Sequence, residues 1–154
     1  MSTLNINQFA QLPVRGEQDL SIARSGVLSG VVSAAQATPL KAGDAVIIDP
    51  AITTVGGVPQ FIAAANADVA FGYVLLDPKL ATIPAPVALQ VLCRSTGPVV
   101  WLVAAATIPP GSPVEQVLVG GDVQVLAAGK LRGIALDYAT VGQLVRILLT
   151  PALA

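Results

Sequence analysis

Of the side chains that most often act as acids, bases or thiol nucleophiles in catalysis, the chain has nine acidic residues and one cysteine but no histidine. Without imidazole, a Ser-His-Asp or Cys-His arrangement is impossible and the usual ligand of catalytic zinc is missing. Cys93 ends the apolar run Val91–Cys93, which is typical of a small buried hydrophobic residue. Asp44 lies in a turn signal and Asp49 precedes a proline, so both are interpreted as turn-forming residues. We therefore predict no enzymatic activity, no metal site and no cofactor.

The composition is poor in charge. Only 11% of the residues are charged and 54% are apolar, with a formal net charge of −1. The lysines and arginines are scattered, which argues against a nucleic-acid partner, because phosphates require a basic stripe. The uncharged stretch 95–114 is interrupted by prolines and glycines, and the first residues lack a secretory pattern, so we predict no membrane segment and no signal peptide. So little surface charge predicts that other subunits cover much of the exterior.

From Pro39 onward, short apolar runs alternate with glycine, proline and aspartate, which is typical of β-strands and tight turns. With 154 residues, the chain suits one compact domain or two very small ones. We predict an all-β fold, a small β-barrel or sandwich of short strands, spanning residues 39–154. Helical turns are conceivable at Gln36–Thr38 and at 63–70. The predicted strands are 45–48, 60–64, 70–75, 87–94, 99–103, 113–119, 123–127, 133–139 and 144–149.

Residues 1–38 are more polar and are predicted to form an extended N-terminal arm that is ordered by packing on a partner. The alternative, that this segment supplies the first strands of the domain, stays open, because residues 20–22 and 27–28 have apolar side chains suited to strands. Trp101, within the run 99–103, is interpreted as a core or subunit-interface residue rather than a ligand platform. The candidate interface residues are Ile6, Phe9, Leu12, Leu20, Ile22 and Trp101.

The β-rich region contains a degenerate internal repeat. Each copy has a proline- or glycine-containing turn, two strands, a strand that begins with glycine and ends near aspartate, and a final apolar strand. Gly43 and Gly111 permit the tight turn. Gly72 and Gly133 allow a close approach between backbones. The matching aspartates, at positions 77 and 137, are expected to end their strands and accept N–H groups of the following turn.

Five segments carry a resemblance to a known family: 42–46, with the sequence AGDAV, 71–74, 108–114, 131–137 and 142–149. The turn-to-strand phrases resemble the β-clip style of entry into a small barrel. Together, these segments resemble the capsid decoration proteins of tailed bacteriophages, also called cement or head-stabilising proteins.

The resemblance implies a homotrimer that binds the major capsid protein on the outer surface of the shell and stabilises contacts between its subunits. The protein would be made in the host cytoplasm and carried on the virion. The alternative is a small β-barrel that binds a carbohydrate or another ligand on a phage tail or surface structure. That function predicts an exposed aromatic platform at Trp101, Tyr73 or Tyr138.

Overall fold

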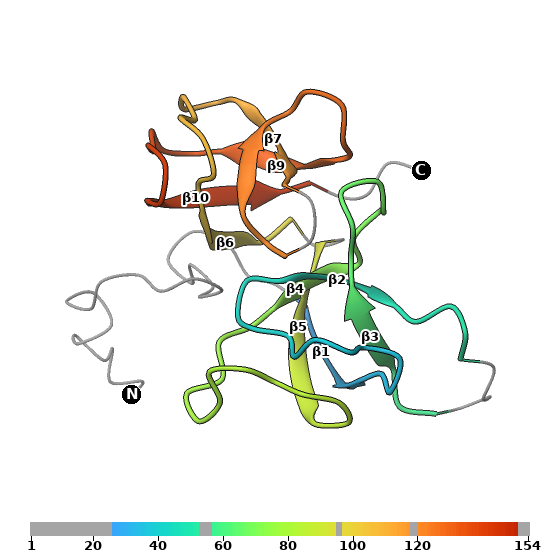
Figure 1. Cartoon of the computed structure of the whole chain (residues 1–154). Helices are drawn as coiled ribbons and strands as arrows, with labels where there is room; N and C mark the ends of the chain where they lie inside the picture. The colour runs from blue at the N-terminus through green and yellow to red at the C-terminus, as the bar shows by residue number, and fades with distance from the viewer. Residues whose placement is uncertain (1–25, 53–56, 95–96, 118–119, 151–154) are drawn as a thin grey trace.

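The computed structural model describes residues 26–52, 57–94, 97–117 and 120–150, which form ten short strands and no α-helix. The all-β prediction is therefore confirmed, and the residues expected to form helical turns lie in bends, turns, loops or strand ends. Figure 1 shows the strands in two groups, β1–β5 and β6–β10. The strands are β1 (Val27–Val32), β2 (Ala45–Ile48), β3 (Gln60–Ala63), β4 (Gly72–Val74), β5 (Ala88–Cys93), β6 (Val99–Val103), β7 (Pro113–Gln116), β8 (Val123–Val125), β9 (Leu131–Ala135) and β10 (Leu144–Leu149).

The two groups have the same topology. The first half is a closed barrel with the strand order β1-β3-β2-β4-β5, in which β1 is parallel to β3 and antiparallel to β5. The second half is a five-stranded sheet with the order β6-β10-β9-β7-β8. A parallel bridge between Ala104 and Val123 corresponds to the parallel pairing of β1 with β3. The predicted repeat is therefore a duplicated fold, to which the structure adds a first strand in each half.

Strand register defines which residues of the two halves are equivalent. In the first half, Tyr73 lies opposite Ala45 on one neighbouring strand and opposite Leu92 on the other. In the second half, Pro113 lies opposite Ile134 in the same way that Ala45 lies opposite Tyr73. Apart from a register shift between Val114 and Glu115 in the second half, the pairings continue with the same spacing, so equivalence is assigned by counting along each strand. The pairs used below are Ser29 with Trp101, Ala45 with Pro113, Ile48 with Gln116, Ala64 with Leu126, Ala70 with Leu131, Tyr73 with Ile134, Gln90 with Arg146 and Leu92 with Leu148.

Strand β1 lies inside the segment that was expected to be an arm. It pairs along Val27–Val31 with β5, and Val31 and Val32 pair with β3, so the barrel begins before residue 39. This arrangement corresponds to the alternative that the sequence left open. Val32 is fully buried in the barrel, and Gly30 leaves room for the Phe61 ring, which a Cβ atom would approach to 2.4 Å. The expected arm residues Ile6, Phe9, Leu12, Leu20 and Ile22 lie outside the described residues.

Glycine is required at equivalent places in both halves. A Cβ atom on Gly72 would lie 2.3 Å from the Leu92 carbonyl oxygen, and one on Gly133 would lie 2.3 Å from the Leu148 carbonyl oxygen. These contacts are closer than any real Cβ contact, and the atoms they meet belong to rigid strand backbone. Gly43 and Gly111 adopt positive φ angles of 81° and 78°, as the predicted tight turns require.

The hydrophobic core consists of two clusters, and the division between the clusters does not coincide with the boundary between the two halves of the chain. One cluster lies inside the first barrel and includes Val32, Phe61 and Val91. The other fills the second half and also takes in residues on one end of the first barrel. These joint residues of the first half are Ala45, Ala64, Ala70, Tyr73 and Leu92, each no more than 1% exposed. The two halves are therefore held together by a shared apolar contact.

The equivalence of the two glycines predicts equal sensitivity to substitution. Gly72→Ala and Gly133→Ala should each lower the free energy of unfolding by about 2 kcal/mol or more, because the added methyl group overpacks a backbone contact. Gly142→Ala is the matched control, since nothing lies within 4 Å of its Cβ position and only its φ angle of 80° is strained. It should cost about 1 kcal/mol. Urea unfolding measures all three, and a large loss at only one of the two strand glycines would contradict the equivalence.

Candidate interaction surfaces

A buried arginine of the second half binds the first half. Arg132, on β9, is 0% exposed, and its guanidinium donates to the carbonyl oxygens of Asp68 and Ala65 at 2.8 and 2.9 Å. It also donates to the Gln116 side-chain oxygen at 3.1 Å, and the Gln116 amide donates to the Ala64 carbonyl at 2.7 Å. Burial lowers the pKa of Arg132. Two side chains of the second half thus satisfy backbone carbonyls around the β3–β4 loop of the first.

An arginine of the first half makes the reciprocal contact. Arg94 follows β5, is 2% exposed, and donates to the carbonyl oxygens of Leu131 and Thr150 at 2.8 and 3.1 Å. It also donates to the carbonyl of Ala70 in its own half at 3.3 Å. Sequence reasoning missed both arginines because it counted them only as scattered cations. The available signal was their position beside short strands whose other side chains are mostly apolar, as in the run VLCR at 91–94.

Glu115 is the most highly coordinated buried carboxylate in the described part of the chain. Its oxygens accept the Gln124 amide at 2.7 Å, the N–H groups of Ala127 and Ala128 at 3.1 Å, and the N–H group of Gly129. The Gln124 bond, with help from the three backbone bonds, holds the pKa of Glu115 below its ordinary value. A carboxylate saturated in this way stabilises the β8–β9 loop rather than exchanging protons with a substrate.

The remaining aspartates are mostly structural, as predicted. Asp44 accepts the N–H of Lys41 at 2.9 Å, and Asp49 accepts the N–H of Ala51 at 2.9 Å, so both are turn-forming residues. Asp77 accepts the N–H of Lys79 at 2.7 Å, again as predicted. Asp137 also follows the end of its strand, as predicted, but its carboxylate pairs with Arg146 on the neighbouring strand and not with N–H groups of the following turn.

Trp101 lies on the outer face of the second half, half-buried on β6. Arg146 is its neighbour on β10, with the guanidinium carbon 5.7 Å from the centre of the indole ring. Asp137 accepts two bonds from that guanidinium, at 2.8 and 2.7 Å, and Arg146 holds the pKa of Asp137 below its ordinary value. Trp101, Arg146 and Asp137 form a partly exposed patch, in which one side of the indole has a cationic neighbour.

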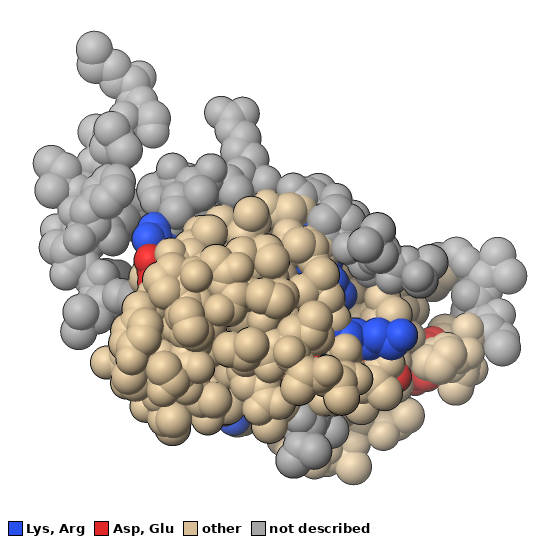
Figure 2. Space-filling model, turned by 90° about the horizontal axis from the view of Figure 1, so that it is seen from above, with Lys and Arg blue, Asp and Glu red and all other residues tan. Residues whose placement is uncertain are grey.

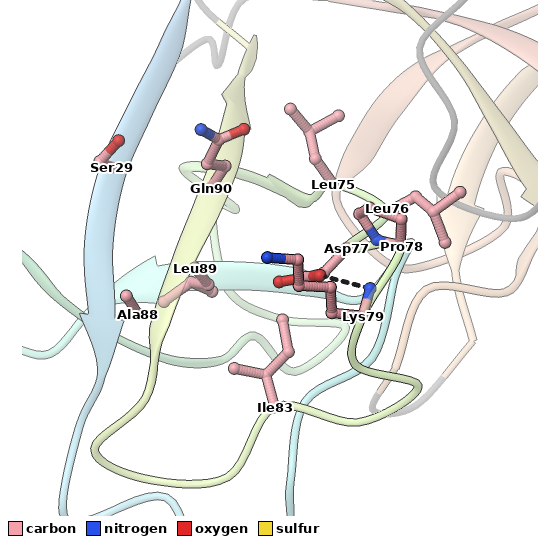
Figure 3. Close-up of a pocket in the computed structure, with 10 residues that line it drawn as sticks. All are labelled: Ser29, Leu75, Leu76, Asp77, Pro78, Lys79, Ile83, Ala88, Leu89 and Gln90. Atoms are coloured by element: carbon pink, nitrogen blue, oxygen red, sulfur yellow. Dashed lines mark hydrogen bonds between the residues drawn. The ribbon is translucent and has the colours of Figure 1, made fainter.

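The equivalent place in the first half is hollow. Ser29 and Gln90 stand opposite each other where the second half has Trp101 and Arg146, and their smaller side chains leave a cavity of about 410 Å³. Figure 3 shows both side chains on neighbouring strands, with Asp77 and Lys79 on the loop across from them. The cavity is lined by Ser29, Leu75, Leu76, Asp77, Pro78, Lys79, Ile83, Ala88, Leu89 and Gln90. None of these is aromatic, so the hollow offers no stacking platform.

The exterior carries few charges and several large apolar side chains. Figure 2 shows a face on which uncharged residues dominate and lysine, arginine, aspartate and glutamate are sparse. Of the two other aromatic residues proposed as a platform, Tyr138 is 60% exposed, whereas Tyr73 is fully buried in the joint. Among the described residues, no cluster of three metal-ligating side chains occurs, and no helix is long and apolar enough to cross a membrane.

The chain thus belongs to the class of all-β folds that contain two tandem copies of a small five-stranded unit. Here the two copies are joined by buried arginines. No protein-family model matches the chain, and no curated protein matches it. Among solved structures, the fold is similar to the N base of the head fiber protein gp8.5 of bacteriophage phi29, with a TM-score of 0.56 and 15% sequence identity. The match covers 85% of this chain and 99% of that chain. The likeness therefore concerns the whole duplicated unit.

Removing the Arg132 guanidinium should destabilise the protein strongly. Arg132→Met leaves the carbonyls of Asp68 and Ala65 without their donor in a buried site, which should lower the free energy of unfolding by about 3 kcal/mol. Lys79→Met, at an exposed cation, is the matched control and should change the free energy by less than about 0.5 kcal/mol. Urea unfolding provides the measurement. Similar losses for both variants would show that the buried guanidinium contributes nothing special.

Glu115 should make the free energy of unfolding depend on pH in the acid range. Its pKa in the folded state is depressed below the ordinary value of 4.5, so its contribution is present above that value and is lost as the pH falls through the folded pKa. Glu115→Gln should therefore be less stable than the parent at neutral pH, and the difference should shrink steadily below about pH 4.5. Thermal unfolding of both proteins across a pH series tests this. A difference that stays constant down to acid pH would contradict it.

Proposed function

We propose that the protein is a structural component of a bacteriophage head that decorates the outer surface of the capsid. In this role, three copies associate, bind the major capsid protein and stabilise contacts between its subunits. The observation that carries the proposal is the fold, which is similar over almost the full length of the N base of a phage head fiber. The likeness covers 85% of this chain.

The surface supports a role in assembly. Charged residues make up only 11% of the chain, and exposed large apolar side chains occur in both halves. Interfaces between permanent partners are depleted of charge in this way. The ionisable side chains with the most contacts, including Arg94, Glu115 and Arg132, bond to backbone groups and support the fold. This use of ionisable groups favours a structural role over catalysis.

A ligand-binding module is the second candidate, and the cavity beside Gln90 is the observation that favours it. A sugar site usually needs an aromatic face, and the cavity has none. Trp101 lies in the other half with Arg146 next to its ring, so a stacking ligand would compete with the guanidinium. The structural role therefore accounts for more of the observations.

The proposal predicts both an oligomer and a place on the particle. Light scattering after size exclusion should give three times the chain mass of 15.6 kDa. Particles of the phage that carries the gene, purified and analysed by quantitative mass spectrometry, should contain the protein in amounts comparable to the major capsid protein. Protease treatment of intact particles should cleave it before the major capsid protein. A monomer at high concentration that is absent from purified particles would overturn the proposal.

A further inference from the structure

We propose that the joint between the two halves binds one small monovalent anion of the halide class, such as chloride. The anion lies between the buried guanidinium groups of Arg132 and Arg94. Its hydrogen-bond donors are the Nε–H group of Arg132 and the hydroxyl groups of Tyr73 and Thr150. By balancing buried charge, the anion helps to hold the two halves in one relative orientation.

Two positive charges are buried in the joint, and their partners are neutral. Arg132 is 0% exposed and Arg94 is 2% exposed. Arg94 donates to three backbone carbonyls, and Arg132 donates to two backbone carbonyls and the Gln116 amide oxygen. Among the described residues, the ion pair of Arg146 with Asp137 has no counterpart at either buried arginine. Carbonyl dipoles satisfy N–H groups but leave the net charge in place, and a buried charge without a counter-charge is costly.

The charges around the joint leave one positive charge to be balanced. Burial lowers the pKa of Arg94, and the field of Arg132 acts in the same direction, so the two cations lie within electrostatic range of each other. Asp68 acts on Arg132 with the opposite sign, and its carboxylate accepts the N–H of Ala65 at 2.7 Å. Two cations and one carboxylate leave a formal charge of +1, so a single monovalent anion makes the joint neutral.

Three polar groups at the same place are buried and, in the described part of the chain, have no hydrogen-bond partner: the Tyr73 hydroxyl, the Arg132 Nε and the Thr150 hydroxyl. Thr150 links the two arginines, because its N–H donates to the Arg132 carbonyl at 3.2 Å and its carbonyl accepts the Arg94 Nε–H at 3.1 Å. Burial raises the pKa of Tyr73 and the fields of Arg132 and Arg94 oppose the rise, so the phenol lies within range of both. Buried donors are normally paired, and an anion pairs all three.

A halide suits these groups better than the other small species. A cation is repelled by both guanidinium groups. A water molecule accepts hydrogen bonds but leaves the charge unbalanced, and sulfate brings more charge and more volume than a closely packed joint can take. The fourth buried polar atom without a partner among the described residues, the Asn66 side-chain oxygen, is an acceptor beside Gly129 and is therefore not a ligand of the anion.

The first test measures urea unfolding of the full chain in mixtures of sodium chloride and sodium gluconate. The total salt concentration is kept constant, so the screening of surface charges does not change. Gluconate is too large for the joint. Above the dissociation constant of chloride, each tenfold increase in chloride should lower the ratio of unfolded to folded chain by up to tenfold. A free energy of unfolding that is the same in all mixtures would overturn the inference.

A conservative variant separates anion binding from ordinary packing. Tyr73→Phe keeps the ring and removes one donor, so the chloride concentration that gives half of the full stabilisation should rise about tenfold. In gluconate alone, this variant should be at least as stable as the parent, because an unpartnered buried hydroxyl is gone. Tyr138→Phe, at a residue 60% exposed, is the matched control and should keep the parent's response. A parental chloride response of Tyr73→Phe, or an equal loss in both salts, would contradict the site.

Crystals grown in sodium bromide identify the occupant directly. Bromide belongs to the same class of anion, and its anomalous scattering distinguishes it from water. A peak should lie within hydrogen-bond distance of the Tyr73 hydroxyl and the Arg132 Nε. Density at that place without an anomalous signal would show an ordered water molecule and overturn the inference, as would the absence of any density there.

Discussion

The fold depends on buried guanidinium groups that satisfy backbone carbonyls across the joint. Arg132 reaches from the second half to the β3–β4 loop of the first, and Arg94 reaches back to the β9 and β10 ends of the second. A charge that is taken out of water is costly unless it is hydrogen-bonded. The terminal nitrogens of Arg132 bond to three acceptors while its Nε has no partner among the described residues, so losing any of these bonds is costly and the arrangement permits only a narrow range of relative positions of the halves. The apolar contact around Tyr73 removes surface of both halves from water, and the arginines fix how one half is oriented relative to the other.

The two duplicated halves share the same backbone arrangement but differ in the side chains on their outer surfaces. The strand order, the turn glycines and the close approaches at Gly72 and Gly133 are the same in both halves. At one equivalent position the second half has Trp101 and the first half has Ser29, so one half bears an aromatic patch and the other a hollow. The two halves of a single chain therefore present different surfaces to partners, although their backbones follow one plan.

Much of the fold was predictable because glycine, proline and aspartate mark strand ends in sequence. The limits of β2, β6 and β10 agree with their predicted ranges, and the repeat was visible from Gly72 and Gly133. Strand β1 was only an alternative, since polar and small residues surround it. The joint was not predicted, because a bond from Arg132 to a loop carbonyl depends on tertiary position alone. For the same reason, the pairing of Asp137 with Arg146 replaced its expected local turn bond.

The uneven division of the core has a consequence for biosynthesis. The first barrel encloses a cluster made only from residues of the first half, so it can close as soon as β5 has left the ribosome. Its Tyr73 and Leu92 end, by contrast, belongs to a cluster completed by strands that are translated later. A nascent chain that pauses after β5 therefore exposes the apolar side chains of Tyr73 and Leu92. They become buried only when translation has continued through β10 and the second half has folded against them.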